Sequence, residues 1–384
     1  MWRSLASNML TFLIVALFLL GGVILWGRSE FTAEGPLDQA ICLRVERGAS
    51  MGSVSRDLAS QGAIRNATIF RLGADYTDKS GKLKAGSFLV EPGASMQEIV
   101  DQVTRGGAST CGTEIVYRVG VTQTLARVRE LDPATSEFAV RAEFDPTQEA
   151  APEIYAAKRA EPDTRYRIAL AEGVTSWQVV EALRAIDVLE GEIAEVPPEG
   201  MLAPDSYEVV PGTLRADLLA QMEEKQRLRI AAAWESRQDG LPISTPEEML
   251  VLASIIEKET GVPEERGQVA SVFVNRLNQG MRLQTDPTVI YGITKGQGVL
   301  GRGLRQSELR SQTPWNTYVI DGLPPTPIAN PGVASLEAAV APEQTGYVFF
   351  VADGSGGHVF AETLEEHNRN VAQWRKIEAE KSGN

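Results

Sequence analysis

The feature that most constrains this chain is a run of apolar residues near its N-terminus. The run extends from Met9 to Trp26 and contains no charged residue. A helix of about 18 to 20 apolar residues spans a lipid bilayer. We therefore predict one transmembrane helix over residues 9–27, with nearly the whole chain on one side of the membrane, because no second run of this kind follows. The run ends in Leu25 and Trp26 rather than in small residues, which favours an uncleaved anchor over the alternative, a cleaved signal peptide.

The composition is that of a globular protein with an acidic surface. Hydrophobic residues make up 43% and charged residues 23% of the 384 residues, a length that suggests two or three domains. The net charge is −14, and no stretch is rich in Lys and Arg. Nucleic acid is therefore not expected as a partner, because phosphate binding requires clustered basic residues.

The chain has two cysteines, Cys42 and Cys111. They allow one disulfide in an oxidising compartment, and two buried thiols are the alternative. Only His358 and His367 could assist in binding a metal, and no spacing suits one, so no metal site is predicted.

Residues 39–106 predict a small module with the order strand, helix, helix, strand. Residues 41–45 alternate as a strand does, two short helices follow, and residues 85–90 predict a returning strand before a further helix. A related pattern recurs within residues 166–240, where Pro-Gly again ends the returning strand. We therefore predict one supersecondary unit used twice.

The segment between the two modules, residues 107–165, is predicted to be an insertion. It has strand-like pieces at 115–119 and 138–140, and a stretch rich in Glu, Ala and Pro over 145–163 that predicts a loop. No function is assigned to it. Residues 214–238 then predict a long charged helix.

The most informative stretch covers residues 245–291. Its opening Thr-Pro-Glu-Glu is a helix start signal of the capping-box kind. The helix that follows is apolar around most of its circumference, so we expect it to be buried. Glu257 and Glu259 stand at its end, where a carboxylate is costly unless it is paired, exposed or used in chemistry.

A cluster of polar residues follows a second helix over residues 265–278. Gln284, Thr285 and Asp286 lie between apolar flanks, and polar groups placed in this way can line a sugar-binding cleft. The alternative is structural, because Asp286 before Pro287 is an ordinary turn or helix cap.

Several long motifs resemble the endolytic murein transglycosylases, the MltG or YceG-like family. They are IIEKET, VFVNRL and GMRLQTDPTVIYG, followed by WNTYVIDGLPPTPIANPG and YVFFVADGSGGHVF. The resemblance is close over residues 245–375 and looser over 38–105 and 166–225, and residues 107–165 depart from the family pattern. Because the motifs occur in the right order, the signal is far more specific than a single short pattern.

The resemblance implies a reaction that needs no cofactor. Lytic transglycosylases cleave peptidoglycan between N-acetylmuramic acid (MurNAc) and N-acetylglucosamine (GlcNAc) with one carboxylic acid. The acid protonates the leaving oxygen, and the resulting carboxylate then takes the proton of the muramic 6-hydroxyl, which closes onto C1 as a 1,6-anhydro end.

Glu257 matches the family's catalytic Glu, the first carboxylate of IIEKET. Spacing alone does not choose between Glu257 and Glu259. The small Ala253 and Ser254 on the face of Glu257 are expected to leave room for a sugar. The structural alternative for a Glu at a helix end is a solvated side chain or a salt bridge.

Three further residues are candidates for binding substrate, in addition to Gln284, Thr285 and Asp286. Asn275 lies on the second helix, and Asn316 and Tyr318 lie in an irregular segment before a turn-rich loop. A Ser-His-Asp triad is rejected because no Gly-x-Ser-x-Gly elbow occurs, and the two histidines are expected to be structural.

The repeated module resembles a LysM-like module, a small glycan-binding fold, and the family carries such a region. This implies that the modules hold peptidoglycan, and the alternative is that they only position the catalytic domain.

We expect an α+β protein with a single N-terminal transmembrane helix, LysM-like β-α-α-β modules and a C-terminal mixed α+β catalytic domain. The family implies an anchor in the inner membrane, a body in the periplasm, a role in cell-wall biogenesis and penicillin-binding proteins as partners. The expected segments are a cytoplasmic N-terminus (1–8), the anchor (9–27), a linker (28–38), the first module (39–106), the insertion (107–165), the second module with its connecting helix (166–240) and the catalytic domain (241–384).

Two other functions stay open. One is a non-catalytic glycan-binding scaffold for cell-wall synthesis, which would tolerate Gln at position 257. The other is a lysozyme-like hydrolase with Glu257 as acid and Asp286 as the second carboxylate, in which water opens the product.

Overall fold

The computed structural model describes residues 2–105 and 110–382. Met1 of the predicted cytoplasmic segment and the predicted boundary between residues 106 and 107 lie outside the described residues. The chain divides into two compact units. The first unit comprises Met1–Ile115, Arg127–Glu143 and Ala151–Arg165, and the second comprises Val116–Ala126, Phe144–Ala150 and Tyr166–Asn384.

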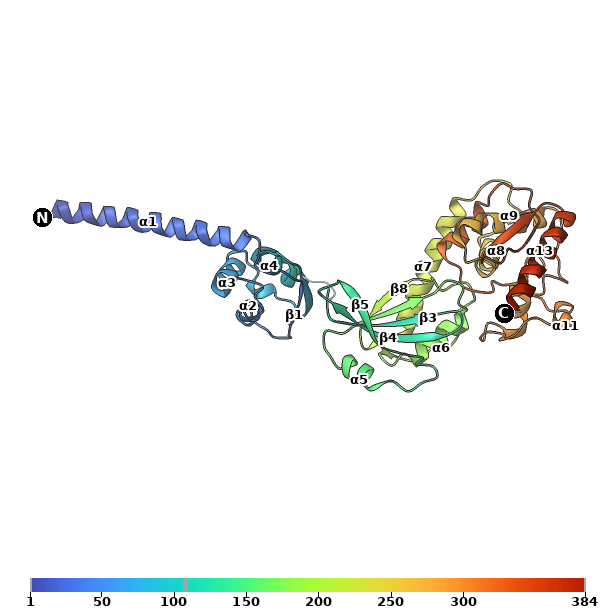
Figure 1. Ribbon diagram of the computed structural model, residues 1–384, viewed down its shortest axis with the longest axis horizontal. Coiled ribbons are helices and arrows are strands. Elements are labelled where there is room, and N and C mark those ends of the chain that lie inside the picture. The colour runs from blue at the N-terminus through green and yellow to red at the C-terminus, as the bar shows by residue number, and fades with distance from the viewer. Residues whose placement is uncertain (1, 106–109, 383–384) are drawn as a thin grey trace. The chain divides into compact units, whose positions relative to one another are not determined.

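The apolar run forms one long helix, α1 (Trp2–Thr32) (Figure 1). Its segment Met9–Thr32 is long and apolar enough to cross a membrane, and none of its most apolar window is buried. The predicted linker over residues 28–38 is wrong in its first part, because α1 continues to Thr32. Phe31 is buried against Gly73, where a Cβ atom would lie 2.3 Å from the Phe31 ring. The end of α1 is therefore part of the core of the first unit.

The first unit contains the predicted strand-helix-helix-strand order. Its elements are β1 (Ile41–Val45), α2 (Met51–Ser60), α3 (Ala67–Tyr76), the 3-10 turn η1 (Ser80–Lys82), β2 (Gly86–Val90) and α4 (Met96–Arg105). β1 and β2 pair antiparallel, with Leu43 opposite Phe88. Side chains of Ser50 and Asn66 cap α2 and α3, which satisfies backbone N–H groups that have no partner within the helix. Leu43, Phe88 and their apolar neighbours on the helices form one core.

Cys42 of β1 and Cys111 form a disulfide, with their Cα atoms 5.8 Å apart. The bond joins positions 69 residues apart in the sequence, so it ties the segment that follows α4 to the strand pair.

A five-stranded sheet has the strand order β5-β4-β3-β6-β8. Its strands are β3 (Thr113–Val119), β4 (Thr124–Asp132), β5 (Glu137–Phe144), β6 (Arg165–Leu170) and β8 (Ser206–Val209). The segment 107–165 therefore supplies three strands of this sheet, among them β4, which the sequence analysis missed. The loop predicted over residues 145–163 contains a helix, α5 (Glu153–Arg159), which begins after Pro152.

The predicted second module is present in part. β6 and β8 pair antiparallel as β1 and β2 do, with Ile168 opposite Tyr207. In the fully described stretch between them the structure has one α-helix, α6 (Ser176–Ala185), where the first module has two. The short strand β7 (Leu189–Glu190) pairs in parallel with β9 (Thr213–Leu214).

The C-terminal part of the second unit is mainly helical (Figure 1). The predicted helices over residues 214–238 and 265–278 correspond to α7 and α9. The elements of this part are α7 (Arg215–Glu235), α8 (Pro246–Glu259), the 3-10 turn η2 (Pro263–Glu265), α9 (Arg266–Asn278), α10 (Asp286–Thr294), α11 (Gln306–Leu309), α12 (Val333–Val340), β10 (Phe349–Ala352), β11 (His358–Ala361) and α13 (Leu364–Ser382).

Helix α8 begins and is buried as its sequence predicts. The Thr245 side chain accepts a 3.2 Å hydrogen bond from the Glu248 amide. The return bond of the capping box goes one residue further back, because the Glu248 carboxylate accepts from the Ser244 amide. Every residue from Met249 to Ile256 is buried, and α8 packs against α7, α9 and α12. The charged residues of the last turn of α8, Glu257 to Glu259, follow this buried stretch and are only partly buried.

Candidate active site

The last turn of α8 presents three charged side chains, Glu257, Lys258 and Glu259, to different surroundings. Successive residues of an α-helix are rotated by about 100°, so Glu257 and Glu259 point in nearly opposite directions. Each of the three is held by a different set of residues within the second unit.

The Glu257 carboxylate is fixed at the start of α12. Its Oε2 accepts a 3.0 Å hydrogen bond from the Gly332 amide and a 2.7 Å hydrogen bond from the Ser335 hydroxyl. Gly332 is the N-cap of α12, and the N-terminus of a helix favours a negative charge. Within the described part of the chain Oε1 has no hydrogen-bonding partner. One carboxyl oxygen is therefore held in place while the other can carry a proton.

A second carboxylate, that of Glu172, lies beside Gly332. A Cβ atom at Gly332 would be 1.7 Å from Oε1 of Glu172, so the carboxylate occupies the space that a side chain would need. Partial burial and the charge of Glu257 raise the pKa of Glu172, against the opposing effects of Arg266 and Arg229. Glu172 was not predicted from the sequence, because its only local signal is its place before Gly173 in the turn after β6.

Lys258 lies at the wall of a cavity of about 310 Å3. Its Nζ donates a 3.2 Å hydrogen bond to the Gly173 carbonyl, and burial lowers its pKa. A cavity of this size can hold a small ligand or part of a larger one. The other lining residues come from α10, from the glycine-rich segment after it and from three more places in the chain: Val121, Thr175, Gln178, Pro287, Ile290, Tyr291, Thr294, Gly296, Gly298, Val299, Leu300, Gly301, Arg302 and Ile328.

Glu199 is a further carboxylate that the sequence analysis missed. It accepts hydrogen bonds from the Ser176 amide, at 2.8 Å, and from the Tyr291 hydroxyl, at 3.2 Å. Burial raises the pKa of Glu199, and burial together with the Glu199 charge raises the pKa of Tyr291. Because Tyr291 lines the cavity, Glu199 supports the cavity wall.

Glu259 belongs to a separate polar cluster with Thr285, Asp286 and Tyr318. The Thr285 hydroxyl donates a hydrogen bond to Glu259, and the Tyr318 hydroxyl donates one of 2.7 Å to Asp286. Burial raises the pKa of Glu259 despite the bond from Thr285, and the Asp286 charge adds to the rise. The structure thus brings three predicted substrate-binding residues together, but around Glu259 rather than around Glu257.

Gln284 precedes this cluster in a left-handed backbone conformation, with φ of +47°, which residues other than glycine rarely adopt. The backbone amide of Gln284 donates a 3.1 Å hydrogen bond to the Thr317 carbonyl. The backbone amide of Thr285 donates one of 3.0 Å to the Thr317 hydroxyl. These bonds leave the side chains of Gln284 and Asp286 exposed to solvent and bury Thr285 between them.

The side-chain amides of Asn275 and Asn316 donate hydrogen bonds to backbone carbonyls. Asn275 donates 2.9 Å hydrogen bonds to the carbonyls of Thr345 and Tyr347. Asn316 is fully buried, and its side-chain amide donates to the carbonyls of Glu308 and Leu309 in α11 and of Ser311 just after it. Its side-chain oxygen accepts from the Tyr318 amide. Both residues therefore shape loops in this structure.

The space expected beside Glu257 is filled. Ala253 and Ser254 are completely buried, and the Ser254 hydroxyl accepts a 3.0 Å hydrogen bond from the Ile328 amide. The expectation that these small residues leave room for a sugar is wrong, because the segment around Ile328 covers this face of α8.

The two histidines lie apart from Glu257. The Nδ1 and backbone amide of His358 each lie 2.8 Å from a carboxylate oxygen of Glu265, and the His367 ring stacks on Phe349. Burial lowers the pKa of His367. Among the described residues no group of three or more His, Cys, Asp or Glu is placed to hold a metal ion.

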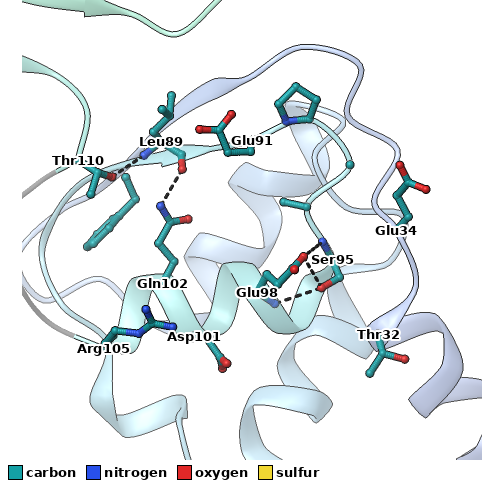
Figure 2. Close-up of a pocket in the computed structure, with 14 residues that line it drawn as sticks. Thr32, Glu34, Leu89, Glu91, Ser95, Glu98, Asp101, Gln102, Arg105 and Thr110 are labelled. Carbon is teal, nitrogen blue, oxygen red and sulfur yellow. Dashed lines mark hydrogen bonds between the residues drawn. The ribbon is translucent and has the colours of Figure 1, made fainter. Parts of the chain in front are cut away.

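The first unit has an open hollow of about 860 Å3 between the end of α1, β2 and α4 (Figure 2). Figure 2 shows Gln102 donating to the Leu89 carbonyl, at 2.7 Å, and the Leu89 amide donating to the Thr110 hydroxyl, at 2.9 Å. Glu91 and Glu98 also line the hollow. Such carboxylate, amide and hydroxyl groups are suited to hydrogen bonding with sugars.

Three known proteins and one solved structure are similar to this chain over most of its length. A protein of Bacillus subtilis named endolytic murein transglycosylase is 29% identical over 94% of this chain and 93% of its own length. Proteins of the same name from two strains of Streptococcus pneumoniae are 26% identical over 87% of this chain, which spans 58% of their length. A crystal structure of a YceG-like protein from Listeria monocytogenes aligns with 86% of this chain and 99% of that one, at 25% identity and a TM-score of 0.45.

The model of the YceG-like family matches residues 43–373 of this chain. Because this match covers well over half of the sequence, the chain belongs to the YceG-like family.

Proposed function

We propose that this protein is a membrane-anchored lytic transglycosylase that cleaves peptidoglycan within its glycan strands. The relatives in Bacillus and Streptococcus are named endolytic murein transglycosylases. The observation that carries the proposal is the carboxyl group of Glu257, which is held through Oε2 by Gly332 and Ser335 and is open at Oε1 in the described structure. A general acid must hold its proton in a fixed direction toward the leaving oxygen, and this arrangement supports that role.

In the proposed reaction Glu257 gives its proton to the glycosidic oxygen of GlcNAc as the bond from that oxygen to C1 of MurNAc breaks. The muramic 6-hydroxyl then attacks C1 and loses its proton to a carboxylate. The product is a 1,6-anhydro-MurNAc end, which is lighter by one water than a hydrolysed end. No water is consumed, and no cofactor takes part.

The polar cluster around Glu259 is proposed to bind the sugar hydroxyls. Gln284 and Asp286 expose their side chains, and Thr285 and Tyr318 hold Asp286 and Glu259 in place. Asn275 and Asn316 are proposed to act on substrate through the loops that they hold.

The helix α1 is proposed to anchor the protein in the inner membrane, with the body in the periplasm. Its apolar segment Met9–Thr32 and its continuation into the core of the first unit support an uncleaved anchor over a signal peptide. The mass of the protein purified from membranes tests this, because signal cleavage would remove the residues of α1. Penicillin-binding proteins stay predicted partners, to be tested by cross-linking in cells.

The two strand-helix modules are proposed to be LysM-like and to hold peptidoglycan, with the hollow of Figure 2 as the contact surface in the first unit. Glycan binding by Gln102→Ala, compared with the exposed control Arg71→Ala, tests this assignment. Equal binding by the two variants would leave the modules with a positioning role only.

A hydrolase is the second candidate, because a second carboxylate, Glu172, stands near Glu257. The expected pairing of Glu257 with Asp286 gains no support, since within the described residues Asp286 bonds to Tyr318 and faces Glu259.

The test is a digest of purified peptidoglycan by the full-length protein in detergent micelles, beside Glu257→Gln and the exposed control Glu264→Gln. We expect 1,6-anhydro ends from the wild type and the control and none from Glu257→Gln. Glycan binding without cleavage by any of the three would favour the non-catalytic scaffold.

A further inference from the structure

Two carboxylates share Gly332 as a common neighbour. The Gly332 amide lies 3.0 Å from Oε2 of Glu257, and the position of a Cβ on Gly332 lies 1.7 Å from Oε1 of Glu172. The amide nitrogen and the Cβ of one residue are about 2.5 Å apart, so the two carboxylate oxygens are separated by at most about 7 Å. Paired carboxylates that act on one glycosidic bond are about 5 to 9.5 Å apart.

The two carboxylates differ in their surroundings. Glu257 is held by two donors, whereas Glu172 is exposed and has no hydrogen-bonding partner among the described residues. The charged groups that face Glu172 are Glu257 of α8, Arg266 of α9 and Arg229 of α7. Glu172 is therefore free to meet a hydroxyl group that enters from solvent beside Glu257.

We propose that Glu172 is the catalytic base that takes the proton of the muramic 6-hydroxyl, which leaves Glu257 with the role of acid alone. The inference rests on the proposed transglycosylase function and divides between two residues the steps that one carboxyl group would otherwise perform. It names a residue of the second strand-helix module as part of the reaction centre.

The step is balanced in atoms and charge. The C1–O4 bond breaks and O4 takes the proton of Glu257, while the O6–H bond breaks, its proton goes to the Glu172 carboxylate and O6 bonds to C1. Glu172 then releases its proton to water and Glu257 takes one from water, which restores both groups. No oxidant, reductant or co-substrate is required.

The order in which the two protons move favours Glu257 as the acid and Glu172 as the base. When Glu257 gives up its proton it becomes negative, and a negative charge nearby raises the affinity of Glu172 for a proton. Glu172 thus becomes a stronger base when the 6-hydroxyl must be deprotonated. The two donors on Oε2 stabilise the carboxylate that Glu257 becomes once it has given up its proton.

The test compares Glu172→Gln and Glu172→Asp with the exposed control Glu195→Gln in the full-length protein, with 1,6-anhydro ends counted at several pH values. Glu172→Gln is expected to lower kcat by about 100-fold with little change in KM, as loss of a general base does. It should also abolish the rise of kcat with pH that reflects ionisation of the base. Glu172→Asp should restore part of kcat and the rising limb, and Glu195→Gln should match the wild type.

Three outcomes separate this inference from the proposed function. Activity of Glu172→Gln within about threefold of wild type, with an unchanged pH profile, would overturn the base assignment and leave Glu257 with both steps. A large loss of kcat with an unchanged profile and no recovery in Glu172→Asp would show a structural role and overturn it as well. Absence of anhydro ends from the wild type itself would instead remove the proposed function.

Discussion

Gly332 donates its amide to Glu257 at 3.0 Å and leaves the space of a side chain to Glu172. A single glycine at the start of α12 thus lies next to both the candidate acid, Glu257, and the second carboxylate, Glu172. Asn330, two residues earlier in the loop that ends in this glycine, is completely buried.

Replacing Ser335 by Ala removes one of the two donors to Glu257. A hydrogen bond to a charged group contributes about 1.5 to 3 kcal/mol, so we expect kcat to fall by about tenfold or more. Steady-state cleavage of peptidoglycan measures this, with the exposed Ser206→Ala as control. Full activity in Ser335→Ala would show that Glu257 does not depend on this contact.

Replacing Gly332 by Ala places a methyl group on the Glu172 carboxylate. The backbone at Gly332 has φ of −74°, which alanine adopts without strain, and the Glu172 side chain can swing into solvent. We expect the free energy of unfolding to change by less than about 1 kcal/mol while kcat falls. A stable Gly332→Ala variant that keeps full kcat would argue against a catalytic place for Glu172.

Replacing Asn330 by Ala should destabilise the second unit without touching substrate. The buried Asn330 amide donates to the Val174 carbonyl at 3.0 Å, and its oxygen accepts from the Leu202 amide at 2.9 Å. Their loss leaves the buried Leu202 amide without this acceptor, at a cost of about 1 to 3 kcal/mol, while the Val174 carbonyl still accepts from the Asn330 backbone amide. Urea unfolding followed by tryptophan fluorescence measures the difference, with the exposed Asn278→Ala as control, and equal midpoints would contradict the prediction.

Glu199 predicts a pH dependence of stability. Burial raises its folded-state pKa above the ordinary value of 4.5, so the folded protein retains a proton that the unfolded chain releases. Its contribution to stability is full below the unfolded pKa and is lost as the pH rises through the folded pKa. Glu199→Gln keeps an acceptor for the Ser176 amide but carries no charge.

The Tm of Glu199→Gln minus that of the wild type should therefore increase over the range that begins near pH 4.5, the ordinary pKa of the group, and extends upward. Thermal unfolding followed by circular dichroism measures both proteins across this range. A difference that stays constant or shrinks as the pH rises would contradict the raised pKa.

Local signals in the sequence predicted helix α8 well. Thr245 and Pro246 mark the start of α8, and the apolar residues after them lie in the core as expected. Strand β4 was missed because its alternating pattern contains Arg127, Arg129 and Glu130, whose charges form ion pairs in the sheet. Helix α5 was missed because a short Glu- and Ala-rich segment after Pro152 has too little periodicity to separate it from a loop.

The site was predicted less completely, since it is assembled from distant segments. Glu257 was identified from its motif, but nothing near Glu172 in the sequence shows that β6 carries it to α12. Asn316 was chosen as a polar residue of an irregular loop, and whether such a residue binds substrate or backbone depends on burial that the sequence does not display.

The most direct test of the central claim is cleavage of peptidoglycan in water labelled with 18O, with the new muramic ends weighed by mass spectrometry. A transglycosylase closes the end with the muramic 6-hydroxyl, so we predict ends that lack one water and carry no 18O, formed by the wild type and absent with Glu257→Gln. Ends that contain one 18O atom would show that water attacks C1 and would establish a hydrolase instead.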